Sequence, residues 1–136
     1  MTLIVVSGEA RRQRQREAAE KAVIAERDRR LEADFEFQGV MYQRDRLSLQ
    51  RIQGATQMAT LAIAAGAQLG DLHWHGGSDP FGWIASDDSV TLMDAQTVVA
   101  FGMAAGARES ALIFAARDLR QMDPIPENLT DDQWWP

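Results

Sequence analysis

Two aromatic arms surround a glycine in Phe35-Glu-Phe-Gln-Gly-Val-Met-Tyr-Gln-Arg-Asp45. Apolar and polar residues alternate up to Gln38-Gly39, and the alternation resumes with Val40 and Tyr42. A tight turn between two such arms needs a positive φ angle, which glycine adopts without strain. This pattern predicts a short β-hairpin over residues 35–45.

A long helix is expected directly after this hairpin. Asp45 or Ser48 is placed to cap its first turn, and the helix should run from about Leu47 to Leu69. Because apolar residues cover much of its circumference, we expect this helix to be buried. Its expected inner face and the residues beside it are Ile52, Ala55, Ala59, Ile63, Met58, Leu61 and Ala65.

A second hairpin and a further helix follow. The stretch from Trp83 to Leu92 has a turn signal at Asp87-Asp88, and Asp94 can cap a helix that reaches about Met122. The apolar stripe of this helix is Val98, Phe101, Ala105, Leu112, Ala115 and Leu119.

The expected core joins both hairpins to both apolar helices. Gly102 and Gly106 lie one turn apart and would allow another helix backbone to approach closely. We expect largely buried side chains at Phe37, Tyr42, Ile52, Ile63, Trp83, Leu92, Phe101 and Leu112.

The chain before the first hairpin has a different character. Thr2 to Val6 is a short β-prone run, and its Ile4, Val5 and Val6 could add to the sheet edge of a partner. Ser7 is a possible N-cap, and the stretch from Glu9 to about Ala33 is rich in strong helix formers. This stretch predicts one continuous helix outside the globular head.

This N-terminal helix has too few large apolar residues for a core helix. Side-by-side packing of its small residues Ala18, Ala22 and Ala25 would bring three chains together, so a homotrimer with this helix at the shared axis is expected. A solvated helix that anchors a monomer to a larger partner is the alternative.

The expected fold is mostly α with short β-hairpins, an α+β fold. Residues 1–34 would form the attachment segment and the long polar helix. Residues 35–136 would form a globular head of two hairpins and two helices, with a C-terminal Trp134-Trp135-Pro136 tail.

Composition narrows the possible partners. The formal net charge of −6 argues against general binding to nucleic acid or to anionic membranes, which need a cationic surface. The chain has no cysteine, which excludes disulfides, thiolate metal sites and thiol catalysis. No apolar run approaches the roughly 20 residues of a membrane span, so no membrane insertion is expected.

Both histidines of the chain lie in one glycine-rich loop. His73 and His75 are two residues apart with Asp71 and Asp79 nearby, which is a low-ranked candidate for a divalent metal site. The chain has no further histidine or cysteine to complete the ligand set, so no cofactor or metal is expected.

Exposed aromatic residues mark two further candidate contact sites. Trp74, His75, Asp79 and Phe81 form a possible receptor-contact loop, although closure of a small core explains such aromatics better. Trp134 and Trp135 would be either a lid on the core or a plug into a neighbouring subunit.

The usual catalytic patterns do not stand out from the background. The sequence has no nucleophile elbow within a parallel α/β pattern, and its single lysine, Lys21, does not follow a phosphate-binding glycine loop. We therefore expect a binding or structural protein and not an enzyme.

The pattern Phe35-x-Phe37-x-Gly39-x-x-Tyr42-Gln43-x-Asp45, with Ser48 and Ile52 after it, resembles a known family. This family is a short domain of unknown function that is common in tail-fibre, tail-assembly and related proteins of phages and prophages. The later parts of the resemblance are Trp83, Val90-Thr-Leu-Met-Asp94, Ala115-Ala-Arg117-Asp118-Leu119 and Trp135-Pro136. It covers about Arg27 to Pro136, and the loop from Asp71 to Phe81 has no counterpart in it.

The resemblance implies a location and no activity. The leading hypothesis is a virion protein of the phage tail, made in the host cytoplasm, which contacts itself and other tail proteins, with a host surface receptor as a further candidate partner. A non-virion chaperone for tail-fibre assembly is the alternative, followed by a head or connector accessory protein. An enzyme that acts on host glycans ranks last.

Overall fold

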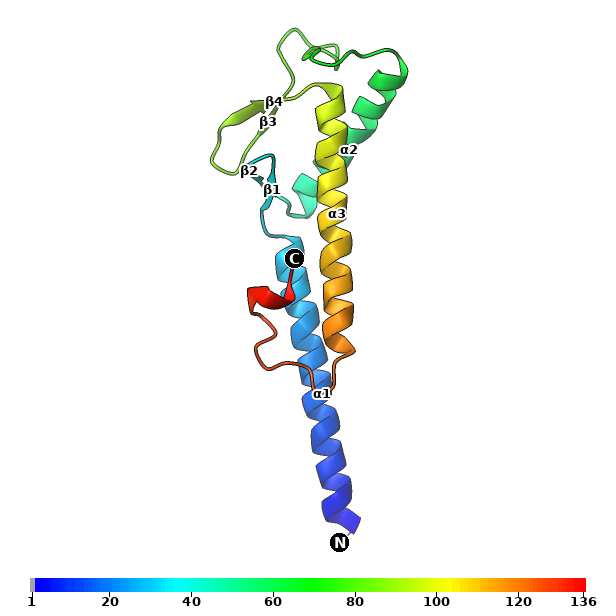
Figure 1. The fold of residues 1–136 in the computed structure, drawn as a ribbon, viewed down its shortest axis with the longest axis vertical. Helices are drawn as coiled ribbons and strands as arrows, with labels where there is room; N and C mark the ends of the chain where they lie inside the picture. The colour runs from blue at the N-terminus through cyan, green and yellow to red at the C-terminus, as the bar shows by residue number, and fades with distance from the viewer. Residues whose placement is uncertain (1) are drawn as a thin grey trace. The chain divides into compact units, whose positions relative to one another are not determined.

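The computed structural model describes residues 2–136, with side chains from Ser7 onward. Within this part the elements are, in order, α1 (Thr2–Leu31), β1 (Phe35–Phe37), β2 (Val40–Tyr42), α2 (Arg46–Ala64), β3 (Gly82–Ile84), β4 (Val90–Leu92), α3 (Ala95–Arg120) and a final 3₁₀ turn, η1 (Asp132–Trp134). Figure 1 shows these elements along the chain. The α+β class expected from the sequence is confirmed.

The chain forms two compact units. Unit 1 combines the residues up to Arg30 with residues 110–136, and unit 2 comprises residues 31–109. The expected boundary after residue 34 lies close to the observed one. The expected head of residues 35–136 is divided, however, because its last residues pack with α1 in unit 1.

Helix α1 begins earlier than predicted. Thr2 to Val6 is helical and not an extended edge strand, and Ser7 lies inside the helix instead of capping it. Among the described residues, the four strands pair only within their own two hairpins, so none of them pairs with this run. Continuing a helix that has already formed satisfies its backbone groups at little further cost. The side chains of Ile4, Val5 and Val6 lie outside the described residues.

Both predicted hairpins are present. Strands β1 and β2 pair antiparallel, and Gln38 and Gly39 both have positive φ angles, 51° and 80°, as a two-residue type I′ turn requires. Strands β3 and β4 also pair antiparallel, with Asp88 at a φ angle of 72° in the connecting turn.

Aspartates cap the two helices that follow the hairpins. The Asp45 side chain accepts a hydrogen bond from the Ser48 amide, so Asp45 and not Ser48 is the N-cap of α2. Asp94 Oδ1 accepts from the Thr97 amide at 2.8 Å, and Asp94 Oδ2 accepts from the Gly70 amide at 2.8 Å. A hydrogen bond from the Thr97 side chain, followed by the bonds from the Gly70 and Thr97 amides, lowers the pKa of Asp94.

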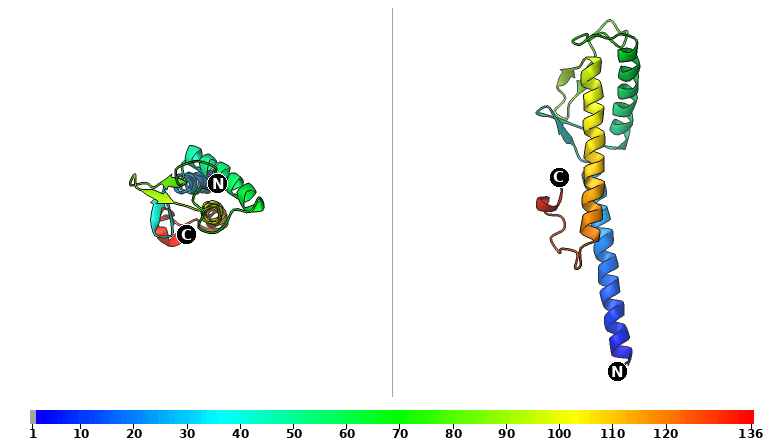
Figure 2. Two further views of the ribbon diagram at one scale, coloured as in Figure 1. Left: turned by 90° about the horizontal axis from the view of Figure 1, so that it is seen from above. Right: turned by 45° about the vertical axis from the view of Figure 1, so that its right-hand side comes forward.

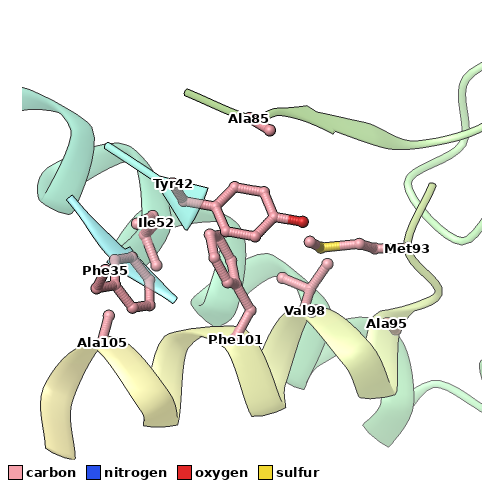
Figure 3. Packing of buried hydrophobic residues seen from close by; sticks show 10 residues of the cluster. Phe35, Tyr42, Ile52, Ala85, Met93, Ala95, Val98, Phe101 and Ala105 are labelled. Carbon is pink, nitrogen blue, oxygen red and sulfur yellow. The ribbon is translucent and has the colours of Figure 1, made fainter. Parts of the chain in front are cut away.

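The core of unit 2 is built around Phe101 on α3. Its ring lies 5.5 Å from that of Phe35, 4.8 Å from that of Tyr42 and 5.4 Å from that of Trp83, measured between centroids. Figure 3 shows Phe35, Tyr42 and Ile52 gathered over this part of α3. The hairpins therefore cover the apolar face of α3 with aromatic rings.

Of the eight residues expected to be buried, four are buried, two are partly buried and two are exposed. Tyr42, Ile52 and Phe101 are fully buried in unit 2, and Leu112 is fully buried. Phe37 and Trp83 are partly buried against the unit 2 core. The prediction was wrong for Ile63, near the end of α2, and for Leu92, on β4, because both side chains are exposed.

Helix α2 is not buried on all sides, which corrects a further expectation. Ile52 and Ala59 are its buried residues, whereas Met58 and Leu61 are exposed. The sequence predicted full burial of α2 because apolar residues cover much of the circumference of this helix. Unit 2 is small and covers only one face of this helix.

Gly102 and Gly106 on α3 differ in their surroundings. A Cβ atom at position 102 would collide with the side chain of Thr56 on α2, whereas a Cβ at position 106 would meet no atom within 4 Å. The prediction of close helix approach is therefore confirmed at Gly102 alone. Gly106 lies at an open groove of about 260 Å³ between α2 and α3.

By length and composition alone, α3 could cross a membrane, contrary to the expectation that no part of the chain approaches a span. Core helices of globular proteins share this composition, and Val98, Phe101 and Leu112 of α3 are fully buried within the chain. Other parts of the described chain thus cover apolar side chains of α3, as they do for a core helix.

Candidate interaction surfaces

Unit 1 is held together by arginines that bind backbone carbonyls. Arg16 on α1 donates to the carbonyl oxygens of Arg120 at 2.6 Å and Met122 at 3.0 Å, at the C-terminal end of α3. The last carbonyls of a helix have no partner within it and carry a partial negative charge. Arg16 therefore caps the end of α3.

A second arginine of α1 fixes the C-terminal segment. Arg30 donates to the Thr130 carbonyl at 3.0 Å and to Asp132 Oδ1 at 2.7 Å, and its guanidinium lies 5.3 Å from the ring centroid of Trp135. Glu26 orients this guanidinium, accepting from Arg30 Nε at 2.8 Å. The segment is thus bound to α1 by charge-assisted hydrogen bonds and a cation–π contact.

Glu26 is a buried carboxylate with two arginine partners. Besides Arg30 it accepts two hydrogen bonds from Arg29, at 2.8 and 2.6 Å. The hydrogen bonds from Arg29 are the largest cause of a lowered pKa at Glu26. Burial opposes that shift, and Arg30 reinforces it. At neutral pH the Glu26 carboxylate is therefore ionised in the folded protein.

Unit 2 contains a third carbonyl-binding arginine. Arg44 is fully buried, donating to the Leu31 carbonyl at 2.6 Å and to the Ala105 carbonyl at 2.7 and 3.2 Å. Leu31 is the last residue of α1, so Arg44 caps that helix. Loss of solvent lowers the pKa of the Arg44 guanidinium from its usual value.

These arginines are the residues that sequence reasoning missed. Arg16 and Arg30 lie among many other arginines near the N-terminus, and Arg44 directly precedes Asp45, so none of the three stands out in the sequence. Their partners are backbone carbonyls about 100 residues away for Arg16 and Arg30. Every residue has a carbonyl, so the sequence carries no signal for such a pairing.

The expected subunit-contact residues of α1 lie on an exposed face. Ala18, Ala22 and Ala25 are exposed, whereas Val23 and Glu26 on a neighbouring face are buried within unit 1. From residue 7 to residue 22 no side chain of α1 is buried. This face is free to contact another molecule.

The two C-terminal tryptophans have different environments. Trp135 is buried, and its indole N–H donates to the Leu129 carbonyl at 2.7 Å. Trp134 is partly exposed, and its indole N–H donates to Asn128 Oδ1 at 3.2 Å. Of the two alternatives, a lid or a plug, Trp135 adopts the position of a lid on its own unit, and Trp134 keeps an accessible edge.

The aromatic residues of the expected receptor loop pack inward. Trp74 donates its indole N–H to the Met93 carbonyl at 3.1 Å, and its ring lies 4.7 Å from that of Phe81. Both rings are partly buried against the unit 2 core, and His75 lies 5.3 Å from Phe81. Asp79 is the exposed member of the group. The arrangement closes the core more than it presents an aromatic platform.

The two histidines are not brought together with acidic residues as a ligand set. His73 Nδ1 lies 3.2 Å from the Gly77 carbonyl, and the Asp71 carboxylate accepts from the His73 amide at 2.8 Å. His75 Nδ1 is buried without a hydrogen-bond partner. Across residues 2–136 no group of three histidine, cysteine or acidic side chains is arranged for a metal ion.

A large open groove in unit 1 also lacks the features of a small-molecule site. Its volume is about 1330 Å³, and it lies between α1 and residues 123–129. Charged residues of both signs line it, including Arg12, Arg16, Glu17, Glu20 and Glu127. Ligand pockets are usually enclosed by apolar side chains with few polar ones.

Comparison with known proteins gives a family and no named relative. No curated protein and no solved structure matches this chain. The family described as "Domain of unknown function (DUF4376)" matches residues 13–133, which includes most of both units. The chain therefore belongs to the DUF4376 family.

Proposed function

We propose that this chain is a structural component of a bacteriophage tail, at the fibre or at the tail tip and baseplate, with a role in assembly or host attachment. The resemblance of residues 27–136 to the short domain found in phage tail-fibre and tail-assembly proteins supports this location.

The observation that carries the proposal is the exposure of α1. The helix spans 30 residues, and from residue 7 to residue 22 none of its side chains is buried. Isolated helices are marginal in water, so a long exposed helix gains stability when other chains cover it. Ala18, Ala22 and Ala25 are small enough for other backbones to approach closely.

In the proposed assembly three copies pack their α1 helices in parallel around this alanine face. Other tail proteins then hold the bundle, and a host surface receptor is the candidate partner of the remaining surface. Flanking charged residues pair between chains, although exposed ion pairs contribute only about 0–1 kcal/mol each. The bundle therefore needs its attached units or an attachment site.

Mass spectrometry of purified phage particles tests the location. A structural protein is retained at a fixed ratio to the major tail protein after washing in salt. An assembly chaperone is abundant in infected cells and absent from the particles, and that result would replace the proposal with the alternative.

Light scattering on the purified chain tests the role of α1. Ala22→Glu places a charge in the proposed seam and should reduce the trimer to monomer or to a smaller assembly. The matched control Gln13→Glu adds the same charge at another exposed position of α1 and should leave the mass unchanged. Equal masses for the two variants and the unmodified chain would contradict the α1 seam.

A further inference from the structure

Helix α2 carries a second apolar stripe that its own unit leaves uncovered. Leu47, Met58 and Leu61 are exposed to 53%, 54% and 65%. The buried residues Ile52 and Ala59 point from the same helix into the core. Figure 2 shows α2, in green, beside α3 with no other element of residues 31–109 along its outer side.

The spacing of this stripe is that of a helix-pairing seam. Its exposed positions are separated by four and three residues in alternation, and they are Leu47, Arg51, Gly54, Met58, Leu61 and Ala65. Two seven-residue series run through them, which is the repeat that keeps one face of a helix against a partner helix. We call this set the outer seam of α2.

The charges of α2 select the direction in which a partner helix would lie. Arg46 and Arg51 are its only charged residues, and both lie in its first two turns. A helix carries a partial positive charge at its N-terminus and a partial negative charge at its C-terminus. Two parallel copies would oppose Arg51 to Arg51. Antiparallel copies place each pair of arginines beside the carbonyl end of the other helix.

Side-chain sizes along the outer seam are complementary in the same arrangement. An antiparallel pair centred near residue 56 sets Leu47 against Ala65, Met58 against Gly54, and the stem of Arg51 against Leu61. A Cβ atom built on Gly54 would have no atom within 4 Å, so its own chain leaves room there for a side chain of another molecule. Large residues thus meet small ones at each end and at the centre.

We propose that the outer seam of α2 binds the outer seam of a second copy of this chain, antiparallel, about a twofold axis near residue 56. Such a contact is isologous, because both copies use the same residues. It does not depend on a phage location or on the α1 bundle. One helix pair forms a small interface, so the association should depend on protein concentration.

Cysteine cross-linking tests the direction of pairing, since the chain has no cysteine of its own. Leu47→Cys and Ala65→Cys proteins are prepared separately, mixed and oxidised. The mixture should give a disulfide-linked dimer of the two variants, and neither variant alone should do so. A dimer formed by Leu47→Cys alone would indicate parallel pairing, and no dimer in any sample would also overturn the proposal.

Light scattering over a range of concentrations tests the surface itself. Leu61→Glu should remove the concentration-dependent doubling of mass, whereas Gln53→Glu, at an exposed position outside the outer seam, should retain it. Circular dichroism confirms that both variants are folded. Doubling that persists in Leu61→Glu, or is absent from the unmodified chain, would disprove the contact.

A third cysteine variant separates this proposal from the α1 bundle. Ala22→Cys should cross-link to itself if α1 helices pack in parallel. Its failure would count against the α1 seam, while the result of the Leu47→Cys and Ala65→Cys mixture would stand independently.

Discussion

Unit 2 and unit 1 are stabilised by different kinds of contact. Unit 2 packs five aromatic rings into one cluster, with Phe101 in contact with the other four. Unit 1 relies on Arg16 and Arg30, which bind carbonyl groups at the end of α3 and in the C-terminal segment. Ring packing tolerates small shifts, whereas a hydrogen bond to a carbonyl fixes distance and direction.

The largest expected effect is the removal of the central ring of unit 2. Phe101→Ala should lower the free energy of unfolding by about 3–5 kcal/mol, because it leaves a cavity among four rings. Urea denaturation measures this loss. Met103→Ala is the control on the same helix, since Met103 is 69% exposed, and it should cost less than about 0.5 kcal/mol. A loss below about 1 kcal/mol for Phe101→Ala would show that the ring cluster is not central.

Replacing the buried arginine tests whether unit 2 also depends on carbonyl binding. Arg44→Met fills a similar space but leaves the carbonyls of Leu31 and Ala105 without this donor. We expect a loss of about 2–4 kcal/mol in the free energy of unfolding. Arg46→Met, two residues further at an exposed position, should be nearly neutral. Equal losses for both variants would mean that the hydrogen bonds of Arg44 are dispensable.

The two glycines of α3 form a matched pair for helix packing. Gly102→Ala forces a collision with Thr56 and should destabilise unit 2 by about 1–3 kcal/mol. Gly106→Ala enters open space and should stabilise the helix by up to about 1 kcal/mol, because alanine has the higher helix propensity. Thermal denaturation should therefore give melting temperatures that change in opposite directions. Changes of the same sign would contradict the close approach at Gly102.

The smallest expected effect concerns the pH dependence of unit 1. The pKa of Glu26 is lowered in the fold from its ordinary value of 4.5. Its stabilisation is therefore complete well above pH 4.5 and is lost as the pH falls through the lowered pKa, because the unfolded chain takes up the proton first. Glu26→Gln should cost about 1 kcal/mol at pH 7 and less at low pH. A difference between the two proteins that does not change with pH would refute this account.

The hairpins and the starts of α2 and α3 could be predicted from the sequence. The alternation around Gly39 predicted the first hairpin, and Asp45 and Asp94 predicted two helix starts, because turns and caps depend on neighbouring residues. The exposure of Leu61 and Leu92 could not be predicted, since it depends on how many elements are available to cover each face. An apolar residue on a regular stripe looks the same whether the protein or a partner covers it.

The residues expected to contact partners have different surroundings in the structure. Ala18, Ala22 and Ala25 were selected for their size, and the structure leaves them exposed. For Trp135 the sequence left a lid and a plug into a neighbour as alternatives, and Arg30 and the Leu129 carbonyl bind it within the chain. From the sequence alone, a tryptophan near the C-terminus is expected to pack against the core or against a neighbouring subunit. The sequence does not show which residue 100 positions earlier provides the contact.

Unit 1 is assembled from residues at both ends of the described chain, while unit 2 is continuous. During synthesis α1 emerges before unit 2, yet Arg30 cannot reach Thr130, Asp132 or Trp135 until those residues have been made. Unit 2 can complete its ring cluster once residue 109 is free, because domains fold as units while translation continues. Arg30 on α1 therefore lacks these partners until the C-terminal segment has been made.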